Sequence, residues 1–297
     1  MKKILFSLIT ICAFLSIGVL SALADTAPVN SAAGNNLSLN WAGYTASAGQ
    51  YTSISGSWIV PAVATSTLSS GDATWVGIGG ISGKDLIQSG TQAIVDSFGN
   101  ITYNSWYEML PSASVDLPVA VKPGDFVSVS ISEISTNLWQ ISFIDNTTGQ
   151  RYVNNFNYTS SMSSAEWIEE MPMINSNFLP LDNFGITNFT NASAIRNGIQ
   201  YTPFGLGATM VTMVNSNNQI TASPSALGSS GNDFSVVRTD NPATISSQIS
   251  PPKAFRGRGG IRTGTGISTF NPHRFVTVRK RPTYQKVVQY SLGRQFR

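Results

Sequence analysis

The strongest constraint on the fold is a regular alternation of apolar and polar residues between positions 125 and 143. Two runs share this pattern and are separated by the turn sequence Ser135-Thr136-Asn137. Their apolar positions are Val127, Val129 and Ile131 in the first run, and Trp139, Ile141 and Phe143 in the second. Because successive side chains of a β-strand point to opposite faces, this pattern predicts a β-hairpin with one buried face.

Similar short segments recur through most of the chain. We expect further strands at residues 51–60, 73–80, 103–110, 151–156, 208–214 and 233–238. Charged residues make up only 11% of the chain, compared with about 25% in an average soluble domain. No helical period of useful length appears, so the sequence predicts an all-β domain.

The N-terminal end has the pattern of a secretory signal peptide at residues 1–24. Lys2 and Lys3 precede a mostly apolar run, and Ala22-Leu23-Ala24 forms a cleavage site. We therefore expect a secreted protein that starts at residue 25, with a short polar leader at 25–36 and no membrane span. The single cysteine, Cys12, lies in this signal, so no disulfide is expected in the mature protein.

The charge is distributed unevenly along the chain. Residues 25–240 hold five Lys or Arg and all fifteen Asp and Glu, whereas residues 241–297 hold eleven Lys or Arg and no acidic residue. We place a boundary near Asp240, with one domain at 37–240 and a basic tail at 241–297. The tail is interpreted as a flexible solvated extension, as an adhesive for an anionic surface or nucleic acid, as a segment folded back on the acidic domain, or as a sequence artefact.

Several chemistries are excluded by composition. His273, in the tail, is the only histidine, so the domain cannot hold a Ser-His-Asp triad or a histidine zinc site. The chain has neither a G-x-S-x-G elbow nor a phosphate-binding loop of the G-x-x-x-x-G-K type. We expect no metal and no cofactor. An enzyme built from this domain would need a Glu or Asp as its general base.

Tryptophan and polar functional groups occur together in three stretches, at residues 75–90, 103–109 and 165–170. On a strand, Asn104, Trp106 and Glu108 would share one face, which suits an exposed peptide or sugar groove. Simpler readings stay open from the residues alone. Glu166 could be an exposed strand carboxylate, Gln88 a buried amide, and the tryptophans core residues.

These stretches resemble the glutamic peptidases, also called eqolisins or peptidase family G1, in a form related to the fungal acid peptidases. The resemblance rests on segments that follow one another in the family's order. They are Asn40–Gly43, Trp75–Ile78, Ile87–Gly90, Ser105–Glu108, Gly124-Asp125, Asn146–Gln150 and Ala165–Ile168. Departures from the family pattern occur at Gly79, Gln92, Leu110 and Glu169, and the family's usual cysteine pair is missing.

The resemblance implies a β-sandwich of two antiparallel sheets, similar to concanavalin and lectins, with a concave substrate cleft. It implies a secreted, monomeric acid endopeptidase that acts on polypeptides. Gln88 and Glu166 would be catalytic, and Trp75, Trp106 and Glu108 would bind substrate. Glu166, with an unperturbed pKa near about 4.3, would activate water, while Gln88 would stabilise the oxyanion.

Two further expectations accompany this interpretation. Glu169 and Glu170 are expected to form a solvated or structural pair rather than to act in catalysis. The alternative to an enzyme is a non-catalytic secreted β-sandwich that binds peptide or carbohydrate through the same aromatic face, because one fold can serve unrelated functions.

Overall fold

The computed structural model describes residues 36–64, 67–81, 84–174 and 177–239. All of them belong to one unit of the chain, residues 1–250. The predicted signal peptide, all of the leader except Asn36, and the basic tail lie outside the described residues. Within the described ranges, no helix has the length and hydropathy that crossing a membrane requires.

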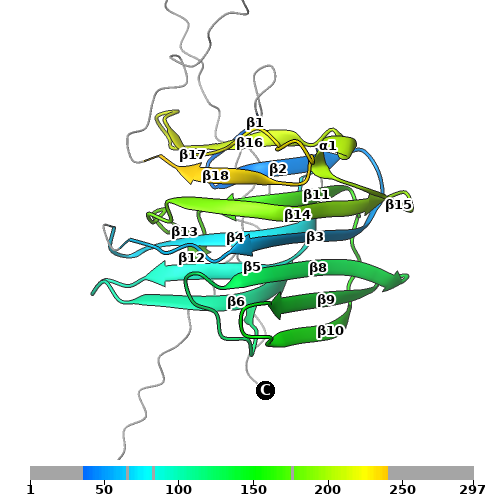
Figure 1. The fold of residues 1–297 in the computed structure, drawn as a ribbon, viewed down its shortest axis with the longest axis horizontal. Coiled ribbons are helices and arrows are strands. Elements are labelled where there is room, and N and C mark those ends of the chain that lie inside the picture. Colours follow the sequence, from blue (N-terminus) through cyan, green and yellow to red (C-terminus); the bar gives the residue numbers. More distant parts are fainter. Residues whose placement is uncertain (1–35, 65–66, 82–83, 175–176, 240–297) are drawn as a thin grey trace, which may run out of the picture. The chain divides into compact units, whose positions relative to one another are not determined.

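The described chain consists almost entirely of β-strands (Figure 1). In chain order they are β1 (Asn36–Ser38), β2 (Trp41–Ser47), β3 (Tyr51–Ile59), β4 (Ser70–Gly79), β5 (Leu86–Val95), β6 (Ile101–Met109), β7 (Val115–Asp116), β8 (Phe126–Ser135), β9 (Leu138–Asp145), β10 (Arg151–Asn157), β11 (Ser164–Glu170), β12 (Met173–Ile174), β13 (Asn177–Phe178), β14 (Ile186–Arg196), β15 (Ile199–Tyr201), β16 (Thr209–Val214), β17 (Ile220–Pro224) and β18 (Phe234–Arg238). The short helix α1 (Pro203–Leu206) begins after Thr202, whose side-chain oxygen accepts the Gly205 N–H.

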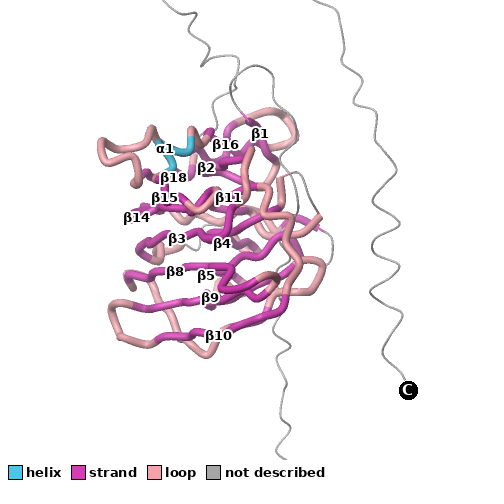
Figure 2. The backbone as a smooth tube through the Cα atoms, turned by 90° about the vertical axis from the view of Figure 1, so that its right-hand side faces the viewer, coloured by secondary structure: helices cyan, strands magenta, loops and turns pink. Residues whose placement is uncertain are grey.

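Hydrogen bonds join most strands into one path, in the order β10-β9-β8-β3-β14-β18-β17-β16-β2-β11-β4-β5-β6-β7. The pairs along this path are antiparallel, and β1 joins it by pairing in parallel with β16. The path doubles back, so that β3, β8 and β14 face β11, β4 and β5 across a shared apolar core (Figure 2). The predicted β-sandwich is therefore confirmed.

The predicted hairpin is present as β8 and β9. Ile131 pairs with Ile141, and the apolar positions of both strands are buried in the core. The serines of β8 lie on the opposite face, where the Ser128 hydroxyl is 2.9 Å from that of Ser57 on β3. The alternation therefore separates a packed face from a polar, half-buried face, as expected.

The longest strand, β14, is not among the strands expected from the sequence. Its apolar positions change phase: Phe189 is buried, and the next buried positions are Ala192 and Ala194. The pairing with β3 shifts register between Thr190 and Ser193, which marks a β-bulge. A bulge inserts one residue and so interrupts the period of two from which a strand is predicted.

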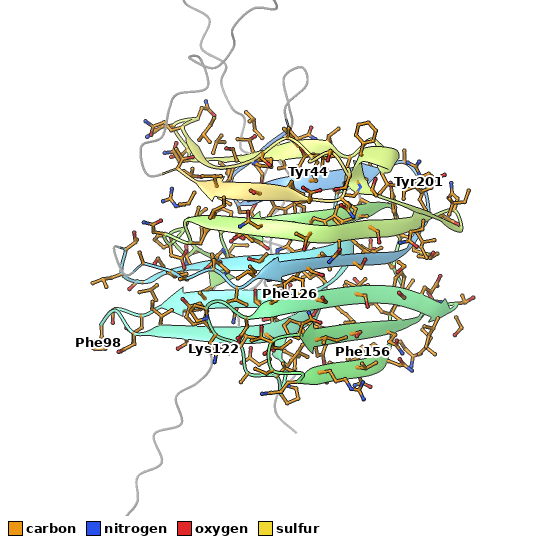
Figure 3. The ribbon with its side chains drawn as sticks, in the orientation of Figure 1. Tyr44, Phe98, Lys122, Phe126, Phe156 and Tyr201 are labelled. Atoms are coloured by element: carbon orange, nitrogen blue, oxygen red, sulfur yellow. The ribbon has the colours of Figure 1, made fainter. Side chains whose placement is uncertain are left out.

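Large aromatic side chains fill the space between the layers, and the polar atoms of two of them are paired. The indole N–H of Trp58 donates to the Thr91 hydroxyl at 2.9 Å, and that of Trp167 donates to the Ser55 carbonyl at 2.8 Å. Phe98, at the turn between β5 and β6, lies away from this core and is 88% exposed (Figure 3). The core is thus held by aromatic packing and, at Trp58 and Trp167, by buried hydrogen bonds.

Three carboxyl groups are buried together at one side of this core: Asp72, Glu169 and Asp182. Asp72 interacts electrostatically with both of the others, and the Thr74 hydroxyl donates to Glu169 at 2.8 Å. Burial raises the pKa of Glu169 to about 8. The pKa of Asp182 is raised to about 10, mainly by burial and secondly by repulsion from Asp72, although Arg238 acts in the opposite direction.

Burial also raises the pKa of Asp72 well above its ordinary value, and the neighbouring Glu169 adds to this effect. Of the two alternatives expected for Glu169 and Glu170, a solvated or a structural pair, the solvated one is wrong, and the buried hydrogen bonds of both side chains agree with the structural one. Both side chains are buried, and because they are adjacent on β11 they point to opposite faces of the sheet. Glu169 points into the core between the layers, where a protonated carboxyl is tolerated far better than a charged one.

We predict that this cluster makes the protein most stable in acid. The folded state holds protons that the unfolded state releases, so the contribution to the free energy of unfolding is complete below the unfolded pKa of about 4. It is lost as the pH rises through the folded pKa of Glu169, about 8, at about 1.4 kcal/mol per group and pH unit. The melting temperature should therefore fall steadily from about pH 4 upward.

The control for this measurement is a carboxyl outside the core. Glu169→Gln should reduce the slope of melting temperature against pH, because the amide has no proton to lose. Glu133→Gln should keep the wild-type slope, since Glu133 is only half-buried and accepts the Asn137 N–H. An equal slope in the wild type and in Glu169→Gln would contradict the prediction.

Candidate active site

Four neighbouring strands bring the predicted catalytic residues into one row. Glu166 on β11 lies opposite Gly77 on β4, Gly77 lies opposite Gln88 on β5, and Gln88 lies opposite Glu108 on β6. Residues directly opposite one another in a sheet project to the same face. Neighbouring strands are about 4.8 Å apart, so the Cα atoms of Glu166 and Gln88 are separated by about 10 Å. Two side chains of this length can reach the space above the glycine between them.

Gly77 keeps that space free. A Cβ atom at this position would lie 2.9 Å from Trp75 Cζ3 and from Leu86 Cδ1, and 3.2 Å from Gln88 Cβ. The first two distances are shorter than real Cβ contacts allow. A glycine is therefore needed here to avoid a clash, and its missing side chain leaves Glu166 and Gln88 facing one another.

Gln88 and Glu108 form a fixed pair. The Gln88 Nε2 donates to Glu108 Oε2 at 2.7 Å, and both side chains are fully buried. The nitrogen end of the glutamine amide therefore faces Glu108. The nitrogen carries a second hydrogen that remains available for another acceptor.

Glu166 is the carboxyl of this row without a hydrogen-bond partner for either oxygen in the part of the chain that the structure describes. Burial raises its pKa well above the ordinary value, the nearby Ser164 hydroxyl lowers it, and the charge of Asp85 adds to the increase. The unperturbed pKa expected from the sequence is therefore wrong. The physical reason is that the Glu166 side chain is fully buried, which disfavours its charged form.

Trp75 lies on the same face and is anchored by Glu170. Its indole N–H donates to Glu170 Oε2 at 2.7 Å, and the Asn40 side-chain amide donates to Glu170 Oε1 at 3.0 Å. Trp41 packs edge-on against Trp75, with ring centroids 5.2 Å apart. Sequence reasoning missed this anchoring role, although Glu166 and Glu170 are spaced so that they must share a strand face.

The structure brings all five predicted site residues onto one face, but it does not expose them. Trp75 and Glu108 are fully buried, and Trp106 is 4% exposed. The two tryptophans belong to a separate apolar cluster on this face, which consists of Trp41, Ala73, Trp75, Leu86, Trp106, Ile168 and Val211. The expectation that Trp106 and Glu108 form an exposed face is therefore wrong in this structure.

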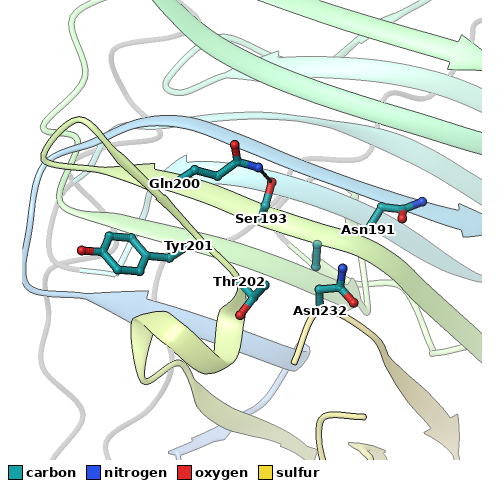
Figure 4. A pocket seen from close by; sticks show the side chains of 7 residues that line it. Asn191, Ser193, Gln200, Tyr201, Thr202 and Asn232 are labelled. Atoms are coloured by element: carbon teal, nitrogen blue, oxygen red, sulfur yellow. Dashed lines mark hydrogen bonds between the residues drawn. The ribbon is translucent and has the colours of Figure 1, made fainter. Parts of the chain in front are cut away.

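A separate pocket lies elsewhere in the described part of the chain. It has a volume of about 530 Å³ and is lined by Asn191, Ala192, Ser193, Gln200, Tyr201, Thr202 and Asn232 (Figure 4). Its residues come from β14, β15 and adjoining loops, and Gln200 donates to the Ser193 hydroxyl at 3.2 Å. It has no carboxylate and shares no residue with the row of Glu166, Gln88 and Glu108.

The chemistry available in the row is that of a carboxyl, an amide and a second carboxyl. In the described ranges, no three His, Cys, Asp or Glu side chains are grouped so that they could hold a metal ion. A carboxyl can transfer a proton, and an amide N–H can stabilise an oxyanion. This combination can hydrolyse an acyl compound by direct attack of water.

Comparison with known proteins defines the class. The model of the Peptidase A4 family matches residues 39–236, and the chain therefore belongs to this family of peptide hydrolases. The resemblance to the glutamic peptidases is thereby confirmed, and the enzyme interpretation is favoured over a non-catalytic binding protein.

Individual relatives agree with this assignment. Aspergillopepsin-2 from Aspergillus niger is 28% identical over 195 residues, which cover 57% of this chain and 69% of that protein. Scytalidopepsin B from Scytalidium lignicola is 30% identical over 192 residues, which cover 61% of this chain and 71% of that protein.

Solved structures show the same fold. Scytalido-glutamic peptidase with a transition-state analogue inhibitor matches with a TM-score of 0.58 and 25% identity, covering 67% of this chain and 98% of that chain. Aspergilloglutamic peptidase from Aspergillus niger matches with a TM-score of 0.52 and 24% identity, covering 57% of this chain and 99% of that chain.

We predict that Gly77→Ala inactivates the enzyme by filling the space between Glu166 and Gln88. The added methyl group should lower kcat/KM by at least about 10-fold and, like other overpacked sites, cost about 1–3 kcal/mol of stability. Peptide cleavage and thermal unfolding measure the two effects separately.

Gly71→Ala is the matched control. It adds a methyl to the same strand and the same face, 2.8 Å from Ile94 Cδ1 and from Leu179 Cδ2, but away from the row. It should lose stability and keep kcat/KM. Equal losses of activity in both variants would contradict the role given to Gly77.

Proposed function

We propose that this protein is a secreted acid endopeptidase in which Glu166 is the general base and Gln88 stabilises the oxyanion. The observation that carries this proposal is the cross-strand row in which Gly77 alone separates the two residues. Secretion is supported by the signal-peptide pattern of residues 1–24. The substrates are polypeptides, as expected for the family.

The first step uses Glu166 in its ionised form. Its carboxylate takes a proton from a water molecule, and the water oxygen forms a bond to the carbon of the scissile peptide. The carbonyl electron pair moves onto oxygen, where the free N–H of Gln88 donates a hydrogen bond to the new negative charge. One such preorganised donor typically contributes roughly 3–4 kcal/mol to the transition state.

In the second step, the proton on Glu166 moves to the peptide nitrogen. The carbon–nitrogen bond then breaks, the oxyanion collapses to a carboxyl group, and the amine leaves. Glu166 is restored to its ionised form for the next cycle. One carboxyl thus serves as base and acid in turn, as in other hydrolases with a single proton-transfer group.

Glu108 prepares Gln88 for this role. Its carboxyl accepts one hydrogen of the Gln88 amide at 2.7 Å, which prevents the amide from turning its carbonyl toward the oxyanion. A glutamine amide does not titrate, so its donor is available throughout the acidic range. We therefore assign Glu108 to positioning rather than to direct contact with the peptide, a revision of its expected substrate-binding role.

The raised pKa of Glu166 sets a lower limit to the working pH. The general base exists only when Glu166 is ionised, and burial makes ionisation more difficult. A water molecule that donates a hydrogen bond to the carboxylate acts in the opposite direction, because it stabilises the charged form. The acidic limb of kcat/KM should report the pKa of Glu166 in the free enzyme.

The catalytic assignment predicts that Glu166→Gln and Gln88→Ala each lower kcat by at least about 100-fold, since each removes a group that acts in the transition state. The assay is cleavage of a denatured protein or a quenched-fluorescence peptide at about pH 4, near the ordinary pKa of a carboxyl. Circular dichroism checks that both variants fold.

Glu133→Gln is a suitable control, because Glu133 lies near the β8–β9 turn, where it accepts the Asn137 N–H at 3.0 Å, and not in the row of Glu166, Gln88 and Glu108. It should retain full activity. A wild-type kcat in both Glu166→Gln and Gln88→Ala would contradict the proposed mechanism. Wild-type protein that binds peptide without cleaving it would favour a binding function instead.

Asp85→Asn should move the acidic limb of kcat/KM to lower pH. The charge of Asp85 contributes to the raised pKa of Glu166, so its removal lowers that pKa and lets the base ionise in stronger acid. The side chain keeps an oxygen that can accept the Ser161 N–H, now at 2.6 Å from the carboxylate. The measurement is the pH profile of kcat/KM.

The matched control is Asp116→Asn, at an exposed carboxylate that accepts a hydrogen bond from Asn104. Its acidic limb should coincide with that of the wild type. A shift of the Asp85→Asn limb to higher pH would have the wrong sign and would contradict the electrostatic explanation.

A further inference from the structure

Tyr158 lies outside the regular strands, in the segment that connects β10 to β11. Its hydroxyl accepts the backbone N–H of Leu86 at 2.8 Å and donates to the backbone carbonyl of Leu110 at 2.9 Å. Leu86 is the first residue of β5, and Leu110 directly follows the last residue of β6. One side chain therefore bridges the ends of the two strands that carry Gln88 and Glu108.

This bridge occupies a specific position in the β-ladder. The Leu110 N–H donates directly to the Leu86 carbonyl at 2.9 Å, which is one of the two bonds that an antiparallel pair normally exchanges. The reciprocal bond, from the Leu86 N–H to the Leu110 carbonyl, is relayed through the Tyr158 hydroxyl. The phenol thus takes the place of a direct backbone bond in the β5–β6 pair.

The next hydrogen-bonded pair along these strands is Gln88 and Glu108. They are cross-strand partners, and the pair between Ile87 and Met109 separates them from the bridged end. In antiparallel strands, hydrogen-bonded and non-hydrogen-bonded pairs alternate. A change in the strand spacing at the bridged pair would therefore also displace the backbone that carries the Gln88 amide and the Glu108 carboxyl.

The segment that connects β10 to β11 forms a second set of hydrogen bonds shortly before it reaches Glu166. Asp85 Oδ2 accepts the Ser161 N–H at 2.6 Å and the Ser160 hydroxyl at 3.2 Å. Where β11 begins, the Ser164 hydroxyl donates to the Gly79 carbonyl at 2.8 Å. The chain from Tyr158 to Ser164 is thus tied to β4 and β5 just before it reaches the general base.

We propose that Tyr158 is a positioning residue for peptide hydrolysis, whose hydroxyl sets the β5–β6 spacing at Gln88 and Glu108 and links these strands to the segment that carries Glu166. The proposal rests on the function proposed above for Gln88. Tyr158 contacts backbone atoms only in this role and takes no part in the chemical step.

The hydroxyl can perform this role at any working pH. Burial raises the pKa of Tyr158 to about 12, and the charges of Asp85 and Glu108 add to the increase, while the Leu86 N–H acts against it. The phenol therefore keeps the proton that it donates to Leu110. Phenylalanine would keep the ring but remove both hydrogen bonds, so the two backbone groups would have to move together or lose their partners.

The test compares Tyr158→Phe with a second tyrosine whose hydroxyl also accepts a backbone N–H. Tyr103, on β6, accepts the Val63 N–H at 3.0 Å and lies toward the other end of that strand. Both variants lose one phenolic oxygen, and both should show a comparable decrease in melting temperature. Cleavage of a quenched-fluorescence peptide gives kcat and KM for each.

We expect Tyr158→Phe to lower kcat by about 10-fold with KM nearly unchanged, because small displacements of catalytic groups are costly to rate. Tyr103→Phe should keep the wild-type kcat. Wild-type kcat in Tyr158→Phe would overturn the proposal, as would an equal loss of kcat in both variants. If Tyr158→Phe does not fold even well below the wild-type melting temperature, Tyr158 is structural and the proposal is also overturned.

Gln88→Ala, measured beside these variants, separates the two hypotheses. Full activity of Gln88→Ala would overturn the catalytic role of Gln88 itself. An inactive Gln88→Ala together with a fully active Tyr158→Phe would overturn only the positioning role of Tyr158.

Discussion

The in-register pairing of β11, β4, β5 and β6 is the constraint on which the rest of the site depends. Backbone hydrogen bonds fix neighbouring strands at a spacing of about 4.8 Å, so the pairing alone decides which side chains can meet. Because Gly77 stands between Glu166 and Gln88 in this row, the two functional groups face one another across a position without a side chain. A slip of one residue in any of these pairs would turn a functional side chain to the other face.

Burial of carboxyl groups has different consequences on the two faces of β11. Glu169 points into the core beside Asp72 and Asp182, where a proton is held and acid favours the folded state. Glu166 points to the opposite face, where the same effect raises its pKa, whereas the proposed mechanism requires its charged form. Low pH therefore stabilises the folded state but reduces the ionised fraction of Glu166, the proposed base. The working pH range is a compromise between these two effects.

Much of the architecture could be predicted from the sequence. The alternation in β8 and β9 reflects one packed and one polar face. Any β-sandwich whose strands bury one face keeps this period of two. β14 could not be predicted in this way, because its bulge changes the phase of the buried positions. Gln88 and Glu166 were found through ordered motifs that resemble a family. The burial of Trp75, Trp106 and Glu108, and the raised pKa of Glu166, depend on packing across strands and have no local signal.

The sequence by itself determined the all-β class and the exclusion of histidine and cysteine chemistry from the domain, and its resemblance to the glutamic peptidases led to the proposal of Gln88 and Glu166 as the catalytic pair. The first two follow from residue types and their order along the chain, and the third follows from the family resemblance. Only the tertiary structure decided that Glu108 holds Gln88, that Glu170 anchors Trp75, and that Tyr158 completes a backbone ladder. Tyr158 is 72 residues from Leu86 and 48 from Leu110 in the chain. Contacts over such separations are created by the folded arrangement of strands, so no local pattern of residues encodes them.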